Sequence, residues 1–292
     1  MSTAEARVAP PGAGAVVPVA RPFAALRWFR SELGLVFRRP RNLVMLGVLA
    51  LVPVVVGVAL RIAQGEVSAE GGAFAQVTGN GLMLAFGAFA VMLPLFLPLA
   101  AAVVAGDSIA GEASRGTLRY LLVTPVSRTR LLVTKFAVIA VYCLAATATV
   151  AASASIAATV LFSPDGMTTL SGTVISGWEM IGRLALAALY LGLGLSALGA
   201  VGLALSTMTE APIAAIAATV VLSVAAQILG AIPQLDVISP YLLTSAWSGF
   251  DAVLRDPMAV SDLRDGLLVF AAYIVIAGAV AWARFADRDI TS

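Results

Sequence analysis

Six long runs without a charged residue divide the chain. They are Asn42–Leu60, Gly71–Gly106, Phe136–Pro164, Leu184–Thr209, Ala211–Leu235 and Gly266–Ala283. The apolar part of the second run is Leu82–Ala105. A membrane-spanning helix needs about 20 mostly apolar residues. The pattern therefore predicts an all-α polytopic membrane protein with six transmembrane helices, at about 42–60, 82–106, 136–162, 184–205, 212–232 and 266–283.

Several polar or small residues inside these runs predict local features. Pro94 and Pro98 predict a kink in the second span, which could serve a gate or simply bend the helix. Gln227 is the most polar side chain deep in a span, and it could contact a substrate or make an interhelical hydrogen bond. Small residues at four-residue spacing in the fourth span (Gly192, Ser196, Ala200) predict a helix-packing face.

The N-terminal region has two parts. Residues 1–20 lack a pattern and predict a flexible cytoplasmic tail, without the features of a secretory signal. In residues 21–41, Phe23, Leu26, Phe29, Leu33 and Phe37 recur at helical spacing, with arginines between them. This pattern predicts an amphipathic helix on the inner membrane face, ended by Pro40. The alternative is a cytoplasmic extension of the first span.

The basic residues indicate the orientation. Six spans place both termini on one side, and that side holds 14 of the 18 basic residues: Arg7, Arg21, Arg27, Arg30, Arg38, Arg39, Arg41, Arg115, Arg119, Arg128, Arg130, Lys135, Arg284 and Arg288. The other side holds Arg61, Arg183, Arg255 and Arg264. Because cytoplasmic loops are enriched in arginine and lysine, we expect both termini, including the tail 284–292, in the cytoplasm.

The composition excludes most soluble and catalytic functions. Of 292 residues, 60% are hydrophobic and 12% are charged, whereas a soluble domain has about a quarter charged residues. The chain has no histidine and one cysteine, Cys143, which excludes histidine triads and metal sites, cysteine zinc sites and intrachain disulfides. The net charge of +2 does not indicate nucleic-acid binding.

No catalytic motif is present in the sequence. The only lysine, Lys135, is followed by Phe136, so the chain lacks the Gly-x4-Gly-Lys-Ser/Thr loop that holds nucleotide phosphates. The six runs contain no ionisable side chain that could relay protons. We therefore expect no enzyme activity, no bound cofactor and no metal site on this chain.

The loop at 107–130 is the most informative segment. Asp107 or Ser108 is predicted to cap a short helix, Gly116 to interrupt it, and Thr117–Thr124 to form a second helix that Pro125 ends. Arg130 and Lys135 are expected to anchor the next span at the inner headgroups. Such a charged, partly apolar protrusion suits docking into a groove of a soluble partner. An ordinary basic loop that only fixes the topology remains the alternative.

This loop carries a resemblance to a known family. The pattern Glu112-x3-Gly116-Thr117-Leu118-x6-Pro125-Val126-Ser127-Arg128-x6-Lys135, directly after the second span, resembles the permease subunits of ATP-binding-cassette transporters of the type-2 exporter class. The tail Arg284–Ile290 is also similar to those permeases. As architecture the resemblance covers nearly the whole chain, and the specific motif covers the loop alone.

The resemblance implies roles for particular residues. The loop would be the coupling helix that binds the ATPase subunit, through Asp107, Glu112, Arg115, Gly116, Thr117, Leu118, Leu121, Pro125 and Arg128. Residues 21–41 would be the connecting helix. Glu210 would be a second ATPase contact, or only a solvated helix start. The outer loop 233–265 would hold short re-entrant helices with Pro240, Tyr241 and Trp247 at an outer gate, or would be a plain surface loop.

The resemblance also implies the function and the partners. The chain would line a substrate pathway in the cytoplasmic membrane of a bacterium, together with a second permease, identical or different, and two copies of a separate ATPase. ATP and magnesium would bind that ATPase. Surrounding lipids would be the other contacts, and nucleic acid would not be one. The alternatives are a permease-like signalling or scaffold subunit and a membrane-embedded enzyme.

Overall fold

The computed structural model describes residues 24–67, 81–116, 128–161, 167–168 and 174–287. The predicted tail at 1–20, the predicted helix at 117–124 and residues 288–292 lie outside these ranges. The elements are α1 (Ala24–Arg38), α2 (Pro40–Val67), α4 (Gly81–Met92), α5 (Phe96–Gly106), α6 (Ala110–Ser114), α8 (Arg128–Leu161), β1 (Met167–Thr168), β2 (Val174–Ile175), α9 (Gly177–Met208), α10 (Pro212–Gly230), η1 (Pro233–Leu235), η2 (Ser239–Tyr241), α11 (Leu243–Trp247), η3 (Ser248–Leu254) and α12 (Val260–Asp287).

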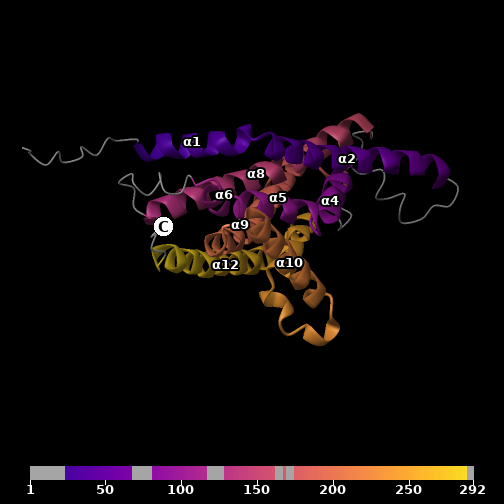
Figure 1. The fold of residues 1–292 in the computed structure, drawn as a ribbon. Coiled ribbons are helices and arrows are strands. Elements are labelled where there is room, and N and C mark those ends of the chain that lie inside the picture. The colour runs from indigo at the N-terminus through magenta and orange to yellow at the C-terminus, as the bar shows by residue number, and fades with distance from the viewer. Residues whose placement is uncertain (1–23, 68–80, 117–127, 162–166, 169–173, 288–292) are drawn as a thin grey trace, which may run out of the picture.

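Long apolar helices dominate the described residues (Figure 1). Five of them are long and apolar enough to cross a membrane: Pro40–Ile62, Arg128–Leu161, Gly177–Met208, Pro212–Gly230 and Val260–Phe285. Leu84–Met92 and Phe96–Gly106 form a bent pair that makes a sixth if it is one span. The predicted helical membrane class is confirmed, with one antiparallel pair of two-residue strands besides. Helices α2, α8, α9 and α12 begin or end beyond the predicted spans, because a helix can continue past its charge-free part, whereas α10 ends two residues before its predicted limit.

Helix α9 is the centre of the bundle. In its apolar window 72% of the residues are buried, against 17% in α2 and in α10. Its small residues allow this: a Cβ on Gly192 would lie 2.7 Å from the Leu144 side chain of α8, and a Cβ on Gly194 would lie 2.7 Å from Trp247. Ser196 and Ala200 are also buried. The predicted packing face of the fourth span is confirmed.

Contacts between distant residues define two ends of the bundle. At one end, which we call the α6 end, Ser206 of α9 bonds the carbonyl of Gly106, and Arg128 of α8 bonds the carbonyl of Phe285. At the other, the η3 end, Gly57 of α2 lies against Leu84 and Leu161. In Figure 1, α1, α6 and the C-terminal end of α12 all lie toward the left. The α4–α5 pair therefore runs from the η3 end to the α6 end.

The predicted kink lies between α4 and α5, which meet at 53°. Pro98 lacks the N–H that would pair with the carbonyl of Pro94 in a continuous helix. The side-chain amide of Gln227 donates to that carbonyl instead, at 2.9 Å. The interhelical hydrogen bond, one of the two roles considered for Gln227, is confirmed.

A side-chain amide also replaces a missing proline N–H between α1 and α2. Pro40 cannot donate to the carbonyl of Val36, and the amide nitrogen of Asn42 does so at 2.9 Å. Helix α1 thus ends where the sequence predicted. Glu32 of α1 pairs with Lys135 of α8, and Phe37 lies against Tyr142. Helix α1 therefore runs alongside α8 in the same direction, and α2 continues that course (Figure 1).

The segment between α10 and α12 folds back onto the bundle. Phe250 of η3 stacks on Phe86 of α4, with ring centroids 5.7 Å apart. Tyr190 of α9 donates to the carbonyl of Ala246 at 2.6 Å, and Arg183 donates to the carbonyls of Val253 and Arg255. In Figure 1 this orange stretch leaves α10 and returns to α12. The apolar side chains of α11 and η3, including Leu243, Trp247 and Phe250, are core residues, whereas Val237 and Tyr241 before them are exposed. The part from α11 to η3 is therefore not a plain surface loop.

Candidate functional site

The turn between α5 and α6 is held by a hydroxyl from a third helix. Ser206 of α9 has no exposed surface. Its oxygen accepts from the backbone N–H groups of Ile109 (3.1 Å) and Ala110 (2.8 Å), and its hydroxyl donates to the carbonyl of Gly106 (2.8 Å). One donor and two acceptor positions are the full capacity of a hydroxyl group. Ser206 therefore caps α6 and ends α5 at once.

The predicted cap of this short helix is wrong. The N-cap position of α6 is Ile109, which has no side-chain cap, and Asp107 is instead the C-cap of α5. The Ser108 hydroxyl donates backward, to the carbonyl of Ala105 at 2.6 Å. Asp107 and Ser108 are good capping residues by type, but Ser206 occupies the position from which a cap must act.

Gly106 and Gly111 permit this close packing, and Gly116 ends the packed segment. A Cβ on Gly106 would lie 2.8 Å from the backbone nitrogen of Ile216 in α10, and a Cβ on Gly111 would clash with the Asp107 carboxylate. Gly116 follows α6 with a φ of 70°, a conformation that side chains disfavour. The segment 106–116 is therefore fixed against α9 and α10, and its path turns sharply at Gly116.

The only lysine of the chain lies between two glutamates. Lys135 Nζ is 2.6 Å from Glu32 Oε2 of α1, and it also pairs with Glu112 of α6. The three side chains are 7%, 10% and 13% exposed. Burial raises the pKa of the Glu112 carboxyl, and Lys135 opposes that rise. Lys135 is therefore a buried link between α1, α6 and α8, and its ammonium pairs with these glutamates instead of facing lipid headgroups.

A second ionic group surrounds Asp107, whose side chain is 5% exposed. Arg39, Arg41 (3.2 Å) and Arg115 (3.5 Å) all pair with the same oxygen, Oδ2. These arginines come from the α1–α2 junction, the start of α2 and the end of α6. Together with the Lys135 group, they link α1, α2, α6, α8 and the end of α5. Helix α9 is joined through Ser206, and α12 through the bond from Arg128 to the carbonyl of Phe285.

The structure brings together only some of the residues predicted to contact an ATPase. Asp107 and Glu112 form ion pairs with other residues of this chain, and Arg128 donates to the carbonyl of Phe285 in α12. Ser114, Arg115 and Gly116 are exposed at the tip of α6. Thr117, Leu118, Leu121 and Pro125 lie outside the described residues. Glu210 is exposed between α9 and α10.

The residues expected at an outer gate do not form one group. Trp247 is 2% exposed and packs against Gly194 in the middle of α9, while Pro240 and Tyr241 are on the surface. Sequence reasoning also missed Ser206, Glu32, Arg39 and Arg41 as site residues. One signal was present: Glu32 is the single acidic residue in the predicted amphipathic helix, where an unpaired charge would be out of place.

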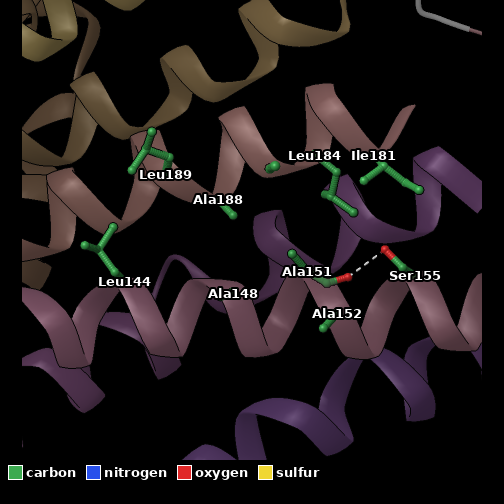
Figure 2. Close-up of a pocket in the computed structure, with 10 residues that line it drawn as sticks. Leu144, Ala148, Ala151, Ala152, Ser155, Ile181, Leu184, Ala188 and Leu189 are labelled. Atoms are coloured by element: carbon green, nitrogen blue, oxygen red, sulfur yellow. Dashed lines mark hydrogen bonds between the residues drawn. The ribbon is translucent and has the colours of Figure 1, made fainter. Parts of the chain in front are cut away.

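An apolar cavity of about 490 Å³ lies between α8 and α9 (Figure 2). Leu144, Ala148, Ala152, Leu184 and Leu189 line it, and its one polar side chain, Ser155, donates to the carbonyl of Ala151 at 2.8 Å. This cavity can take hydrocarbon but offers no charge for orienting a polar ligand. In the described ranges, no group of three or more Asp, Glu or Cys side chains is arranged to hold a metal ion.

Comparison with known proteins gives one family. No curated protein matches the chain. The family model described as "Protein of unknown function (DUF2705)" matches residues 51–291. The match runs from the middle of α2 to the residues after α12, and it includes α6, Lys135 and Ser206. The chain belongs to the DUF2705 family.

Proposed function

We propose that this chain is the membrane-spanning permease subunit of an ATP-binding-cassette exporter. One observation carries the proposal: α6, which follows the α4–α5 pair, is a short helix fixed to the bundle, with an exposed tip at Ser114–Gly116. A soluble ATPase could push on such a tip, and the motif that resembles a coupling helix begins in α6. Two such subunits and two ATPase copies would form the transporter.

The contacts of α4 and α5 support six crossings. Leu84 lies beside Gly57, in the second half of α2, and Leu161, the last residue of α8. Gly106 lies beside Ser206 and Ile216, at the α6 end. A re-entrant pair would return to the end from which it started, whereas this pair connects opposite ends. Its proline break is then a bend within one span.

The distribution of arginines supports a cytoplasmic α6 end. Arg39, Arg41, Arg115, Arg128 and Arg130 all belong to this end. Positive residues accumulate on the cytoplasmic side of membrane proteins. Both termini would therefore be cytoplasmic, as expected for a permease whose ATPase binds from inside.

The bonds of α6 suggest how a force would spread. A displacement of α6 acts on α9 through Ser206 and on α8 and α1 through Glu112 and Lys135. Since α9 is the central helix, a shift there changes the packing of α5, α8, α10 and α12. ATP would bias two arrangements of this bundle from a distant site, which is allosteric coupling. ATP and magnesium bind the partner, and this chain performs no covalent step.

The experiment is co-purification of the tagged chain from its host in mild detergent, followed by an ATPase assay. Ser114→Trp puts a bulky ring at the exposed tip without removing an ion pair. Ser248→Trp is the matched control, because Ser248 is exposed at the η3 end. We expect a stoichiometric ATPase with the wild type and with Ser248→Trp, and loss of it with Ser114→Trp.

Two other results would change the assignment. If no ATPase accompanies the wild-type chain, the permease proposal is wrong and the α6 tip is only a structural turn. If an ATPase is present but reconstituted vesicles move no cargo during ATP hydrolysis, the chain is a signalling or scaffold subunit instead. A membrane-embedded enzyme lacks support, because the titratable groups of the α6 end are engaged in ion pairs.

A further inference from the structure

At the α6 end, the acidic side chains and Lys135 are more deeply buried in the protein than the arginines that pair with Asp107. Asp107, Glu32, Glu112 and Lys135 have side chains 5–13% exposed. Arg39, Arg41 and Arg115 are 31%, 47% and 51% exposed. The negative charges are thus buried within the group, and its outward face consists of guanidinium groups. We call these three residues the arginine face.

The charges of this group do not balance. Three arginines pair with Oδ2 of Asp107, and Arg115 lies equally close to Oδ1. Glu32 and Glu112 share Lys135. Among these pairs of the described residues, four cations stand against three carboxylates, an excess of one positive charge. The guanidinium groups around one oxygen also repel one another. An external anion with a single negative charge would neutralise the group and separate the arginines.

The arginine face lies where the apolar helices begin and end. Arg39 and Arg41 flank Pro40, the first residue of the apolar window of α2. Asp107, the carboxylate that gathers the arginines, directly follows α5, whose residues from Ala100 to Gly106 are all buried and apolar. This is the depth at which the phosphates of lipid headgroups lie beside a membrane protein. A ligand at this depth is most readily supplied by the bilayer itself.

We infer that Arg39, Arg41 and Arg115 bind the phosphate of an anionic phospholipid. A guanidinium presents paired N–H donors that match phosphate oxygens and is always charged. The phosphodiester of phosphatidylglycerol has one negative charge, which equals the excess of the group. Phosphatidylcholine has the same phosphodiester, but its ammonium would face the arginines. The site is therefore selective for lipids with net negative charge, and it does not depend on the proposed transport function.

The test counts retained lipids by native mass spectrometry of the detergent-purified protein, titrated with phosphatidylglycerol or phosphatidylcholine. We expect the wild type to prefer phosphatidylglycerol by about tenfold. Arg41→Gln/Arg115→Gln removes two of the three guanidinium groups and should abolish this preference, while Arg39 still pairs with Asp107. Arg27→Gln/Arg30→Gln removes two exposed arginines from α1 and is the control for surface charge. Its preference should equal that of the wild type.

Each contrary result overturns the inference in a different way. An equal loss in both pairs means diffuse attraction to positive charge, without a site. An unchanged preference in the Arg41/Arg115 pair leaves the arginine face to another partner, such as an acidic protein surface. Inorganic phosphate is titrated in neutral-lipid nanodiscs as a further arm: if it raises the thermal midpoint of the wild type but not of the pair, the ligand is free phosphate.

A second variant guards against a failure to fold. Arg41→Lys/Arg115→Lys keeps both charges and loses the paired donors. If the glutamine pair does not elute as a single species in gel filtration, the lysine pair is compared with the wild type instead. It should show a reduced preference for phosphatidylglycerol, and an unreduced one overturns the inference.

Discussion

At the scale of single residues, Lys135 has the largest expected effect on stability. Its ammonium compensates two carboxylates that are almost fully removed from solvent. Removing one member of a buried ion pair leaves an uncompensated charge, which typically costs about 3–5 kcal/mol, whereas replacing the whole group with neutral residues is often tolerated. The two kinds of replacement therefore distinguish a structural ion group from a surface charge.

We predict that Lys135→Met lowers the free energy of unfolding by about 3 kcal/mol. The triple variant Glu32→Gln/Glu112→Gln/Lys135→Met should recover most of the loss. Thermal unfolding in detergent, followed by tryptophan fluorescence, measures both. Arg27→Met removes an exposed cation from α1 and is the control. A Lys135→Met midpoint equal to that of the control would show that the three charges are solvated.

Ser206 gives a second prediction at this scale. Ser206→Ala leaves the N–H groups of Ile109 and Ala110 buried without an acceptor, which should cost about 1–3 kcal/mol. Hydrogen exchange of these two amides should become faster. Ser223→Ala is the matched control, because the Ser223 hydroxyl is buried and has no hydrogen-bond partner among the described residues. If the two variants exchange alike, Ser206 does not hold α6.

The sequence could identify the residues of this site better than their roles. Composition singled out the loop 107–130 and the only lysine, since both are unusual in so apolar a chain. It could not show that Glu32 and Ser206, 103 residues before and 100 residues after their partners Lys135 and Gly106, complete the site. Sequence reasoning looks for a capping residue next to the helix that it caps, whereas Ser206, which caps α6, belongs to α9.

At the scale of elements, two proline breaks are repaired by side-chain amides. Asn42 and Gln227 each donate to the carbonyl that the proline leaves without a partner. Sequence reasoning predicted both breaks, because proline removes a helical hydrogen bond wherever it occurs. Only the structure shows the compensation at Pro94, because Gln227 is 133 residues away. The amphipathic pattern likewise predicted a helix at α1 but could not show that it packs against α8.

The bend between α4 and α5 can be tested with a double-mutant cycle. Gln227→Ala should cost about 0.5–1.5 kcal/mol, because the Pro94 carbonyl loses its donor in an apolar environment. In a Pro98→Ala background the residue at 98 regains its N–H and can bond that carbonyl, so the cost of Gln227→Ala should fall to near zero. Thermal unfolding of the four proteins gives the coupling. Additive effects would mean that Gln227 acts elsewhere.

At the scale of the whole molecule, the hydrophobic pattern was the most informative signal. A run of about 20 apolar residues is sufficient for a span whatever its sequence, so each predicted span coincides with a helix or with the bent pair. Order within the bundle depends on which small residues meet. Helix α9 is central because Gly192, Gly194, Gly199 and Gly202 admit neighbours on several sides, and no periodicity indicates which helix will fill them.

The number of crossings determines the topology, and the single cysteine makes it measurable. Cys143 is buried, so an impermeant maleimide should leave the wild type unlabelled in intact cells. Cysteines are then placed at three exposed serines, Ser31 in α1, Ser114 in α6 and Ser248 in η3. With six crossings, Ser248→Cys should be labelled in intact cells, and Ser31→Cys and Ser114→Cys only after permeabilisation.

The pair Ser31 and Ser114 decides the result, because α2 and the α4–α5 pair are the described helices between them. If α4–α5 were a re-entrant loop, only α2 would cross, and the two cysteines would react from opposite sides. The contacts of Gly106 with α9 and α10, and of Leu84 with Gly57 in the second half of α2, favour the same side. Labelling from opposite sides would therefore contradict both the six-span topology and the assembly of the α6 end from α1, α6 and α8.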